Sequence, residues 1–310
     1  MKWTTIIFMA LMMPVGWAQP SFPVLYTHTE IEYAERSTVN PVDDFAAIHI
    51  PFELSGGLII VKGVIDGEQG QFVFDTGSPS MLVNKPLAGG VSNSYIIGLG
   101  RAKEVQKIKI NEFSWAFRRA RSMNAYAIDL KHIEQMTQEK LLGVIGSDGL
   151  WSTEIVFDFD KKEMALRPGG DNYADHGEKI QLPFHMVGHL AVVTIQVNGK
   201  RLRFGIDTGA SVNVIHKRTA KALQSSFQTL PKEILIQDVN NKVTRAKCVS
   251  AENISYQEAQ LSATSFCVVD LDSLHDSSNI NLDGLLGIPF LRQNNVSIDF
   301  EKKIIYFSGN

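Results

Sequence analysis

The 310-residue chain has only two cysteines, so its fold does not rest on a dense disulfide framework or a multi-cysteine metal cluster. It also lacks an excess of positive charge, because 30 lysines and arginines are set against 33 acidic residues. A net charge of −3 provides no basic surface for phosphates, and we expect no nucleic-acid partner. Serine-hydrolase, zinc-protease and phosphate-loop motifs are missing too. We therefore expect neither a cofactor nor a metal.

Long apolar runs are also missing beyond the N-terminus. There, Lys2 precedes an apolar run over residues 6–15, and the small residue Ala18 follows, which is typical of a cleavable export signal. The alternative is an uncleaved anchor, but the run contains Pro14 and is shorter than the roughly 20 residues that a membrane-spanning helix needs. We expect residues 1–18 to be a signal peptide. The mature protein is then exported to the periplasm or secreted, without stable membrane insertion.

The next segment, residues 19–44, contains three prolines and little periodicity, which is typical of an extended arm or a pro-segment. Further along, Cys248 and Cys267 lie in β-like surroundings and can pair as one disulfide in an exported protein. The alternative is a pair of buried thiols that act as small apolar side chains.

The chain contains Asp-Thr-Gly twice, at residues 75–77 and 207–209, inside a repeated framework. Over a first block the two copies match at an offset of 132 residues (207 − 75), and over a second block at 141 (284 − 143). The matched pairs include Pro51 and Pro183, Phe52 and Phe184, Gly67 and Gly199, Phe72 and Phe204, Gly143 and Gly284, and Gly146 and Gly287. This period is too long for a solenoid unit. It predicts two tandem lobes, residues 45–170 and 171–310.

Each Asp-Thr-Gly is preceded by a predicted β-hairpin. The turn dipeptide Asp66-Gly67 separates strand-like residues 58–65 and 71–74, and Asn198-Gly199 does the same between residues 192–197 and 202–206. Helical patterns are few and short: residues 131–140, residues 217–223 and a turn after Pro289. The sequence predicts an all-β fold of two antiparallel, barrel-like lobes.

These motifs resemble those of the retropepsin-like aspartic proteases, in the single-chain, two-lobed form found in pepsins. Both copies have an apolar residue before Asp-Thr-Gly, and an apolar-apolar-Gly follows downstream at 144–146 and 285–287. The resemblance spans about residues 45–310 and implies an exported bacterial protease of the acid protease fold, with two pseudo-symmetric lobes and a cleft between them. It implies a monomer that contains an intramolecular pseudo-dimer.

The resemblance implies an aspartic endopeptidase that hydrolyses extended polypeptides through a water activated by Asp75 and Asp207. Two carboxyl groups held close together share one proton, so one acts as a base while the other acts as an acid. By the same resemblance Thr76 and Thr208 lock the two loops across the lobe interface, and Gly77 and Gly209 permit tight turns.

The residue after each Asp-Thr-Gly differs: the hydroxyl of Ser78 can donate a hydrogen bond to the neighbouring carboxylate of Asp75, whereas Ala210 has no donor for Asp207. We predict from this difference an asymmetric dyad in which Asp75 is the favoured ionised member. The glycine-rich segment that includes Ile97, Gly98, Leu99 and Gly100 resembles the substrate-binding flap of retropepsins, with residues 103–105 as the returning strand. The alternative is an ordinary surface hairpin.

Two other readings stay open. The chain can be a catalytically silent binding module of the protease shape, because Pro79 and the run Ser147-Asp148-Gly149 depart from the family pattern. Alternatively, lobes of two molecules pair with each other. His185 and His189 are four residues apart beside a predicted strand, and that spacing does not favour a shared metal.

Overall fold

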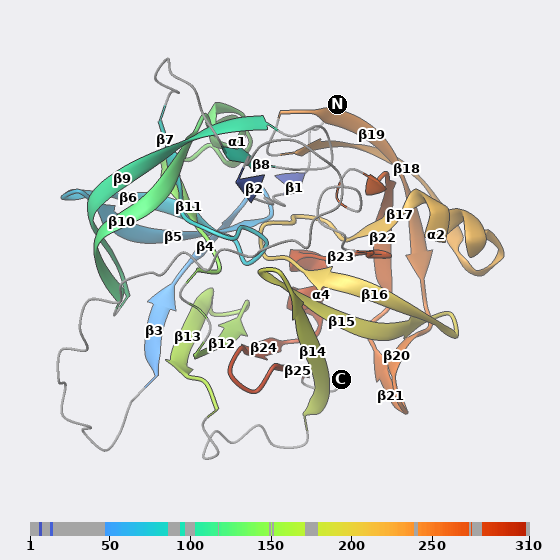
Figure 1. Ribbon diagram of the computed structural model, residues 1–310. Helices are drawn as coiled ribbons and strands as arrows, with labels where there is room; N and C mark the ends of the chain where they lie inside the picture. The colour runs from blue at the N-terminus through green and yellow to red at the C-terminus, as the bar shows by residue number, and fades with distance from the viewer. Residues whose placement is uncertain are drawn as a thin grey trace.

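The protein is mainly β and forms two sheets, as the sequence predicts (Figure 1). The computed structural model describes residues 6–7, 13–14, 47–85, 94–96, 103–116, 118–148, 150, 152–170, 179–238, 241–272, 274 and 281–307. Among these residues, no helix has the length and apolar character to cross a membrane.

The first half of the chain contributes thirteen strands and one helix to this fold. They are β1 (Ile6–Ile7), β2 (Met13–Pro14), β3 (Ile48–Pro51), β4 (Glu53–Ser55), β5 (Leu58–Ile65), β6 (Glu68–Phe74), β7 (Leu82–Asn84), β8 (Ser94–Ile96), β9 (Lys103–Trp115), β10 (Arg118–Ile128), α1 (Lys131–Thr137), β11 (Leu141–Ile145), β12 (Thr153–Asp158) and β13 (Glu163–Pro168).

The second half has a similar composition, with short helices where the sequence predicts them. Its elements are β14 (Ile180–Val187), β15 (Leu190–Val197), β16 (Lys200–Ile206), β17 (Val214–His216), α2 (Lys217–Ala222), the 3₁₀ turn η1 (Gln224–Ser226), β18 (Gln228–Asp238), β19 (Val243–Ala251), β20 (Ile254–Tyr256), β21 (Ala259–Leu261), β22 (Thr264–Val269), β23 (Gly284–Leu286), α4 (Ile288–Gln293), β24 (Val296–Asp299) and β25 (Ile304–Phe307).

The internal repeat of the sequence appears as repeated hairpins. Strands β5 and β6 reappear 132 residues later as β15 and β16, with the same antiparallel pairing. The turn residues Asp66 and Gly67 have φ angles of 49° and 82°, and Asn198 and Gly199 have 49° and 77°. Positive φ at both positions is typical of a type I′ turn, which matches the twist of the strands it joins. Each hairpin therefore delivers its aspartate at an equivalent place.

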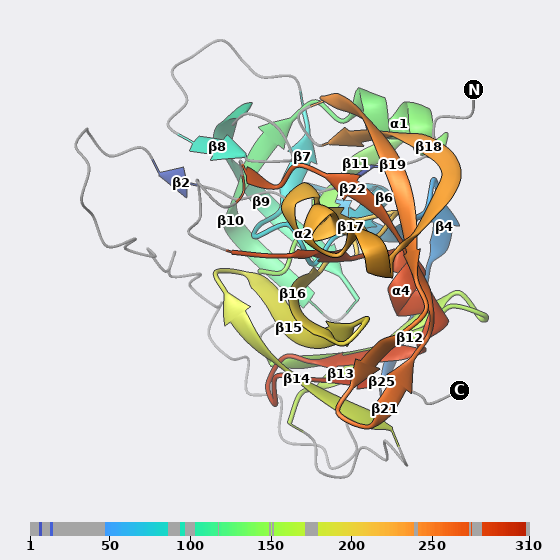
Figure 2. The same ribbon diagram turned by 90° about the vertical axis from the view of Figure 1, so that its right-hand side faces the viewer.

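The two halves share one continuous sheet layer, ordered β14-β25-β24-β12-β13-β3. The junction is the antiparallel pair β12–β24, in which Ile155 lies opposite Ile298. Figures 1 and 2 show this layer in the lower part of the molecule, with β20 and β21 at its level and most other strands above it. The layer joins the lobes by backbone hydrogen bonds as well as by packing.

Apolar side chains from both faces of the strands form the core. The repeat is visible here too, because Phe52 packs edge-on against Phe159 with ring centroids 5.7 Å apart, and Phe184 packs on Phe300 in the same way at 5.9 Å. In β5, residues 58–61 are all buried. Leu58 and Ile60 pack into one apolar cluster, and Ile59 and Val61, on the opposite face of the strand, pack into another. Burial of both faces explains why these residues form an apolar run rather than an alternating pattern.

A buried ion pair stabilises the shared layer. The Glu154 carboxylate is fully buried and accepts two hydrogen bonds from the guanidinium of Arg167, at 2.7 and 3.0 Å. It also accepts a hydrogen bond from the hydroxyl of Ser297 in β24. A carboxylate in this position is tolerated because its charge and its lone pairs are both matched.

We predict that Arg167→Leu lowers the apparent free energy of unfolding by about 3 kcal/mol, because it leaves the buried charge of Glu154 unpaired. Urea denaturation measures the loss. The matched control is Arg245→Leu, because Arg245 forms an exposed pair with Glu233. This substitution should lower the free energy of unfolding by less than about 1 kcal/mol. Equal losses in the two variants would contradict a special role for the buried pair.

Candidate active site

The two Asp-Thr-Gly loops lie at equivalent strand ends. Asp75 follows β6, which pairs in parallel with β11, and its N–H donates to the carbonyl of Ile145 at 3.0 Å. Asp207 follows β16, which pairs in parallel with β23, and its N–H donates to Leu286 at 3.1 Å. A backbone hydrogen bond at the start of each loop thus fixes the position from which each carboxyl group projects.

Gly143 and Gly284, which lie downstream of the two Asp-Thr-Gly motifs, allow a neighbouring strand to pass close to each of them. A β-carbon on Gly143 would lie 2.1 Å from the carbonyl oxygen of Leu82, and one on Gly284 would lie 2.1 Å from that of Val214. These distances are far below any real contact of a β-carbon. Strands β7 and β17 can therefore pair with β11 and β23 only because both positions are glycine.

The two loops are locked together by their threonines. The N–H of Thr76 donates to the hydroxyl of Thr208 at 2.9 Å, and the N–H of Thr208 donates to the hydroxyl of Thr76 at 3.1 Å. Each hydroxyl in turn donates to a carbonyl of the opposite lobe, Thr208 to Phe74 at 3.0 Å and Thr76 to Ile206 at 3.4 Å. Both side chains are buried, so these bonds form away from solvent.

The glycines of the two motifs bring the carboxyl groups together. The N–H of Gly77 donates to Oδ1 of Asp75 at 2.8 Å, and Gly209 does the same for Asp207 at 2.8 Å. Each glycine also lies against the carboxyl group of the other lobe: a β-carbon on Gly77 would be 2.5 Å from Oδ1 of Asp207, and one on Gly209 would be 2.4 Å from Cγ of Asp75. A side chain at either position would displace the opposite carboxyl group.

The resulting carboxyl pair is fully buried, and its proton affinity is high. Burial raises the pKa of Asp75 well above its ordinary value, and the charge of Asp207 and a hydrogen bond with it add to the effect. Burial raises the pKa of Asp207 to about 7, against the opposing hydrogen bonds from Asp75 and the N–H of Gly209. Two acids in such contact cannot both ionise near neutral pH, so the pair holds a shared proton.

The hydroxyl of Ser78 corrects one sequence-based prediction. It donates to the carbonyl of Ser80 at 2.9 Å, and not to the carboxylate of Asp75 as we predicted. The carbonyl of Ser78 in turn accepts hydrogen bonds from the N–H and the hydroxyl of Ser147, at 2.8 and 2.9 Å. Ser78 therefore shapes the loop rather than the charge of its neighbour. Ala210 occupies the equivalent buried place in the second lobe without a donor.

Three side chains that support the loops were not predicted from the sequence. Ser147 is the first of them, and its position after the apolar-apolar-Gly was read only as a departure from the family pattern. Asn213 accepts the N–H of Gly287 at 2.9 Å. His189 contacts the carbonyl of Gly77 at 2.8 Å, whereas His185 contacts Arg203, so the two histidines have different partners. None of the three belongs to an Asp-Thr-Gly motif, so the two motifs by themselves do not reveal them.

The flap and the cysteine pair were also singled out in the sequence. Strand β8 pairs antiparallel with the start of β9, but the flap residues Ile97, Gly98, Leu99 and Gly100 lie outside the described residues, and their role stays a prediction. Cys248 and Cys267 face each other across β19 and β22 as buried free thiols, with their sulfur atoms 3.5 Å apart. Burial raises the pKa of the Cys267 thiol, so this sulfur is a poor nucleophile at neutral pH.

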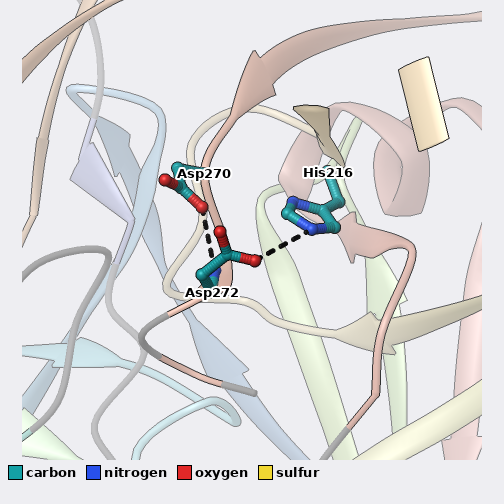
Figure 3. A group of neighbouring side chains, drawn as sticks. All are labelled: His216, Asp270 and Asp272. Atoms are coloured by element: carbon teal, nitrogen blue, oxygen red, sulfur yellow. Dashed lines mark hydrogen bonds and ion pairs between the residues drawn. The ribbon is translucent and has the colours of Figure 1, made fainter. Parts of the chain in front are cut away.

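A cluster at the end of β17 brings together His216, Asp270 and Asp272, whose ligand atoms lie within 4.8 Å of one another (Figure 3). The ammonium group of Lys217 already lies 2.5 Å from Asp270 and 3.0 Å from Asp272. Although partial burial opposes ionisation, hydrogen bonds from this lysine and from the N–H of Asp272 lower the pKa of Asp270 to about 2.

The histidine of this cluster is also engaged in a way that disfavours a metal. The N–H of Leu271 donates to Nδ1 of His216 at 3.3 Å, which uses the one lone pair of a neutral imidazole. Its Nε2 then carries the proton and lies 3.4 Å from Asp272. The guanidinium of Arg218 lies 2.6 Å from the same carboxylate. We interpret the cluster as an ion-pair network; the expectation that the protein holds no metal stays a prediction.

The raised pKa values of the dyad predict how stability depends on pH. In the unfolded chain both carboxyl groups ionise near about pH 4, so between about pH 4 and pH 7 the folded protein binds more protons, and its stability falls as pH rises. As pH rises over this range, the melting temperature should therefore fall more steeply for the native chain than for the double variant Asp75→Asn/Asp207→Asn. Asp270→Asn serves as control and should keep the native slope, because its lowered pKa leaves this carboxylate ionised throughout the range. Equal slopes in native and double-variant protein would refute the raised values.

Comparison with known proteins finds a related family for part of the chain. Residues 193–293, which include the second Asp-Thr-Gly, match the family described as "gag-polyprotein putative aspartyl protease". No curated protein matches the chain in sequence. Solved structures that match include the crystal structure of Basic 7S globulin from soybean, which is 12% identical, with a TM-score of 0.48, over 84% of this chain and 94% of that one. The predicted resemblance to the retropepsin-like aspartyl proteases is thus confirmed, through a family match to the second lobe.

Proposed function

We propose that the protein is an aspartic endopeptidase. The observation that carries this proposal is the pair of fully buried carboxyl groups, Asp75 and Asp207, brought into hydrogen-bond contact from two loops that lock each other through Thr76 and Thr208. Burial of two acids is costly unless they share a proton, and a structural role would be served as well by amides. The retention of both acids therefore favours a catalytic role over a structural one.

In the proposed mechanism the nucleophile is a water that both carboxyl groups hold. The ionised aspartate takes a proton from the water as its oxygen attacks the peptide carbonyl, while the protonated aspartate gives its proton to the carbonyl oxygen. A tetrahedral diol results, with no covalent bond to the enzyme. The protonated carboxyl group then gives its proton to the amide nitrogen while one hydroxyl of the diol gives its proton to the other carboxylate, the C–N bond breaks, and the dyad returns to its singly protonated state.

We propose that the substrate binds as an added β-strand. Two strand edges support this idea, because β8 pairs with the short strand β2 and β18 pairs with β1. In both views β2 lies beside β8 (Figures 1 and 2). Removal of residues 1–18 during export, as the sequence predicts, would leave both edges open to another extended chain. Main-chain hydrogen bonds of this kind bind peptides with little dependence on sequence.

We predict that the chain without residues 1–18 cleaves members of a mixed peptide library, as measured by mass spectrometry of the products. Asp75→Asn and Asp207→Asn should each abolish cleavage, by about 10³-fold or more, because either change removes the shared proton. A statine-type transition-state mimic should inhibit the native protein. Asp270→Asn is the matched control and should cleave normally, since this acid lies in the ion-pair network of α2.

The same experiment tests the alternative function. Peptides that bind the native chain and both dyad variants equally, without being cleaved, would identify a catalytically silent binding module and refute the proposal. Cleavage that survives in both variants would also refute it, because another group would then be responsible. The departures at Pro79 and Ser147 do not decide the question, since Ser147 stabilises the active-site loop.

The pH dependence of cleavage follows from the raised pKa values. Catalysis needs the singly protonated pair, and burial raises the pKa of both members above the value of about 4 for an exposed aspartate. The active range should therefore lie well above about pH 4, extending toward neutral pH, and not at the strongly acidic values that an unburied pair would give. A bell-shaped profile of kcat/KM centred near about pH 3 would contradict this prediction.

A further inference from the structure

The two cysteines of the chain lie directly opposite each other in the second lobe. Cys248 of β19 and Cys267 of β22 are register partners in an antiparallel pair, and their sulfur atoms are 3.5 Å apart. A strand residue lies opposite at most two others, so two cysteines placed at random in 310 residues would be partners in about one chain in 150. Chance is thus a poor explanation of their position.

The backbone around Cys267 shows which kind of pair the two cysteines form. The N–H of Cys267 donates to the carbonyl of Asn213 at 2.9 Å, and so points toward β17 and away from β19. In an antiparallel ladder the N–H and the carbonyl of one residue point to the same side, so Cys248 and Cys267 exchange no backbone hydrogen bond.

This kind of pair suits a covalent bond between the side chains. Its α-carbons lie about 4.5 Å apart, and its side chains are closer than those of a hydrogen-bonded pair. A disulfide spans α-carbon distances of about 4.4–6.8 Å, so the backbone separation already fits. Bond formation then requires the sulfur atoms to approach from 3.5 Å to about 2.0 Å.

The internal repeat shows that the backbone plan alone does not call for two thiols at this place. At the offset of 141 residues, the equivalent pair of the first lobe is Lys107 and Tyr126 (248 − 141 and 267 − 141), and these residues are also register partners. The N–H of Tyr126 donates to the carbonyl of Met81 at 3.1 Å, which repeats the hydrogen bond of Cys267. The same backbone thus accepts a lysine and a tyrosine.

The cysteine pair lies where a hairpin leaves the sheet. The register pairs of β19 with β22 run from Cys248 to Ala251, and the register of β19 with β18 is interrupted at the same level, between Thr229 and Glu233. Beyond this point residues 233–238 of β18 and 243–247 of β19 pair with each other, and we call them the arm. Figure 1 shows β18 and β19 extending together along the top of the molecule.

The arm connects the cysteine pair with the proposed function. Its residues Gln237 and Asp238 pair with β1, and they form one of the two edges at which we proposed that a peptide strand binds. On the other side, the carbonyl that Cys267 bonds belongs to Asn213, whose side chain accepts the N–H of Gly287. A bond between the cysteines would therefore join the arm to a support of the second active-site loop.

We propose that Cys248 and Cys267 form a disulfide, which clamps the base of the arm to β22. The sequence left a disulfide and a pair of buried thiols open, and the non-hydrogen-bonded register at the base of the arm favours the disulfide. The effect of this clamp on substrate binding rests on the proposed function, but the bond itself does not.

The oxidant is a disulfide of the thiol–disulfide exchange class, which an oxidising compartment supplies. A thiolate of the pair attacks this disulfide, forms a mixed disulfide and releases one thiolate of the oxidant. The second cysteine then attacks the protein sulfur of the mixed disulfide, which forms the bond between Cys248 and Cys267 and releases the other thiolate. The pair loses two protons and two electrons, and the oxidant becomes two thiols.

Burial determines when this exchange takes place. Each cysteine is 5% exposed, and burial raises the pKa of the Cys267 thiol, so the folded pair offers little thiolate and little access to an oxidant. The exchange therefore takes place during folding, while β19 and β22 are still apart. The finished bond is shielded from reductants for the same reason.

The test of the bond is refolding of the full chain, unfolded in urea with a reductant, in a buffer of reduced and oxidised glutathione. After the remaining thiols are alkylated, cleavage after Glu252 and Glu258 separates the two cysteines, so only a disulfide keeps their fragments joined in mass spectrometry. We expect most refolded chains to carry the bond, and the folded reduced chain to form it at least about 10-fold more slowly. Alkylated cysteines in the refolded chain would overturn the proposal, and equal rates would overturn the order of exchange and folding.

Amide hydrogen exchange measured by NMR tests the clamp. Val249 and Phe266 are the next register pair of the β19–β22 ladder, and by alternation they hydrogen-bond to each other. Their exchange should be slower in the oxidised chain by about 10-fold or more, because the strands can no longer separate at the cysteines. The equivalent pair of the first lobe, Ile108 and Ala125, is the matched control and should not change. The same exchange rates at Val249 and Phe266 in both states would refute the clamp.

Cys248→Ala separates the bond from other effects of the buffer. This variant should refold in the glutathione buffer with the exchange rates of the reduced chain. In a chain that cleaves peptides, reduction should raise KM by roughly 3–10-fold with little change in kcat, because the clamped arm presents its edge in one position. An unchanged KM would refute a role of the bond in substrate binding. A chain that does not cleave refutes the proposed function and leaves the mass and exchange measurements to decide the disulfide.

Discussion

The reciprocal hydrogen bonds between Thr76 and Thr208 are the interaction on which the site depends. Each threonine receives the N–H of the other and donates its own hydroxyl to a carbonyl across the lobe interface. Because these four bonds join loops that are more than 120 residues apart in the chain, neither loop can move without breaking bonds of the other. Loss of one hydroxyl would leave buried N–H and carbonyl groups unpaired, which is more costly than the loss of the bond itself.

Close approach of backbone and side chains lets this lock hold two acids in one place. Gly77 and Gly209 lie directly against the carboxyl group of the opposite lobe, and Gly143 and Gly284 lie directly against a crossing strand. The four glycines therefore permit four close contacts, two with carboxyl groups and two with backbone carbonyls, that any β-carbon would prevent. The same closeness excludes solvent from the carboxyl groups, and this exclusion raises their pKa values. Stability and proton affinity are thus set by one packing arrangement.

The two lobes share a backbone plan but differ in the side chains that support it. Ser147 holds the first loop through the carbonyl of Ser78, whereas Asn213 holds the second through the N–H of Gly287. His189 contacts the carbonyl of Gly77 in the first loop, whereas the residue at the equivalent place in the repeat, Gly57, lies against Ser211 after the second. A duplicated fold places two equal acids together, but general acid and general base chemistry needs them to be unequal. Differences in the supporting residues can supply this inequality while the dyad itself remains symmetric.

The sequence by itself determined the repeated framework, the mainly β fold, the two hairpins with their Asp-Gly and Asn-Gly turns, and the identity of the two acids, because turn chemistry and strand patterning act over a few residues. It placed the helices near α1, α2 and α4 for the same reason. Only the tertiary structure decided which donors face each carboxyl group. Ser78 was predicted to donate to Asp75 from its adjacency alone, yet its hydroxyl turns to Ser80, and His189 reaches the same loop from 112 residues away. Such contacts depend on how the lobes pack, and no local pattern of residues specifies that packing.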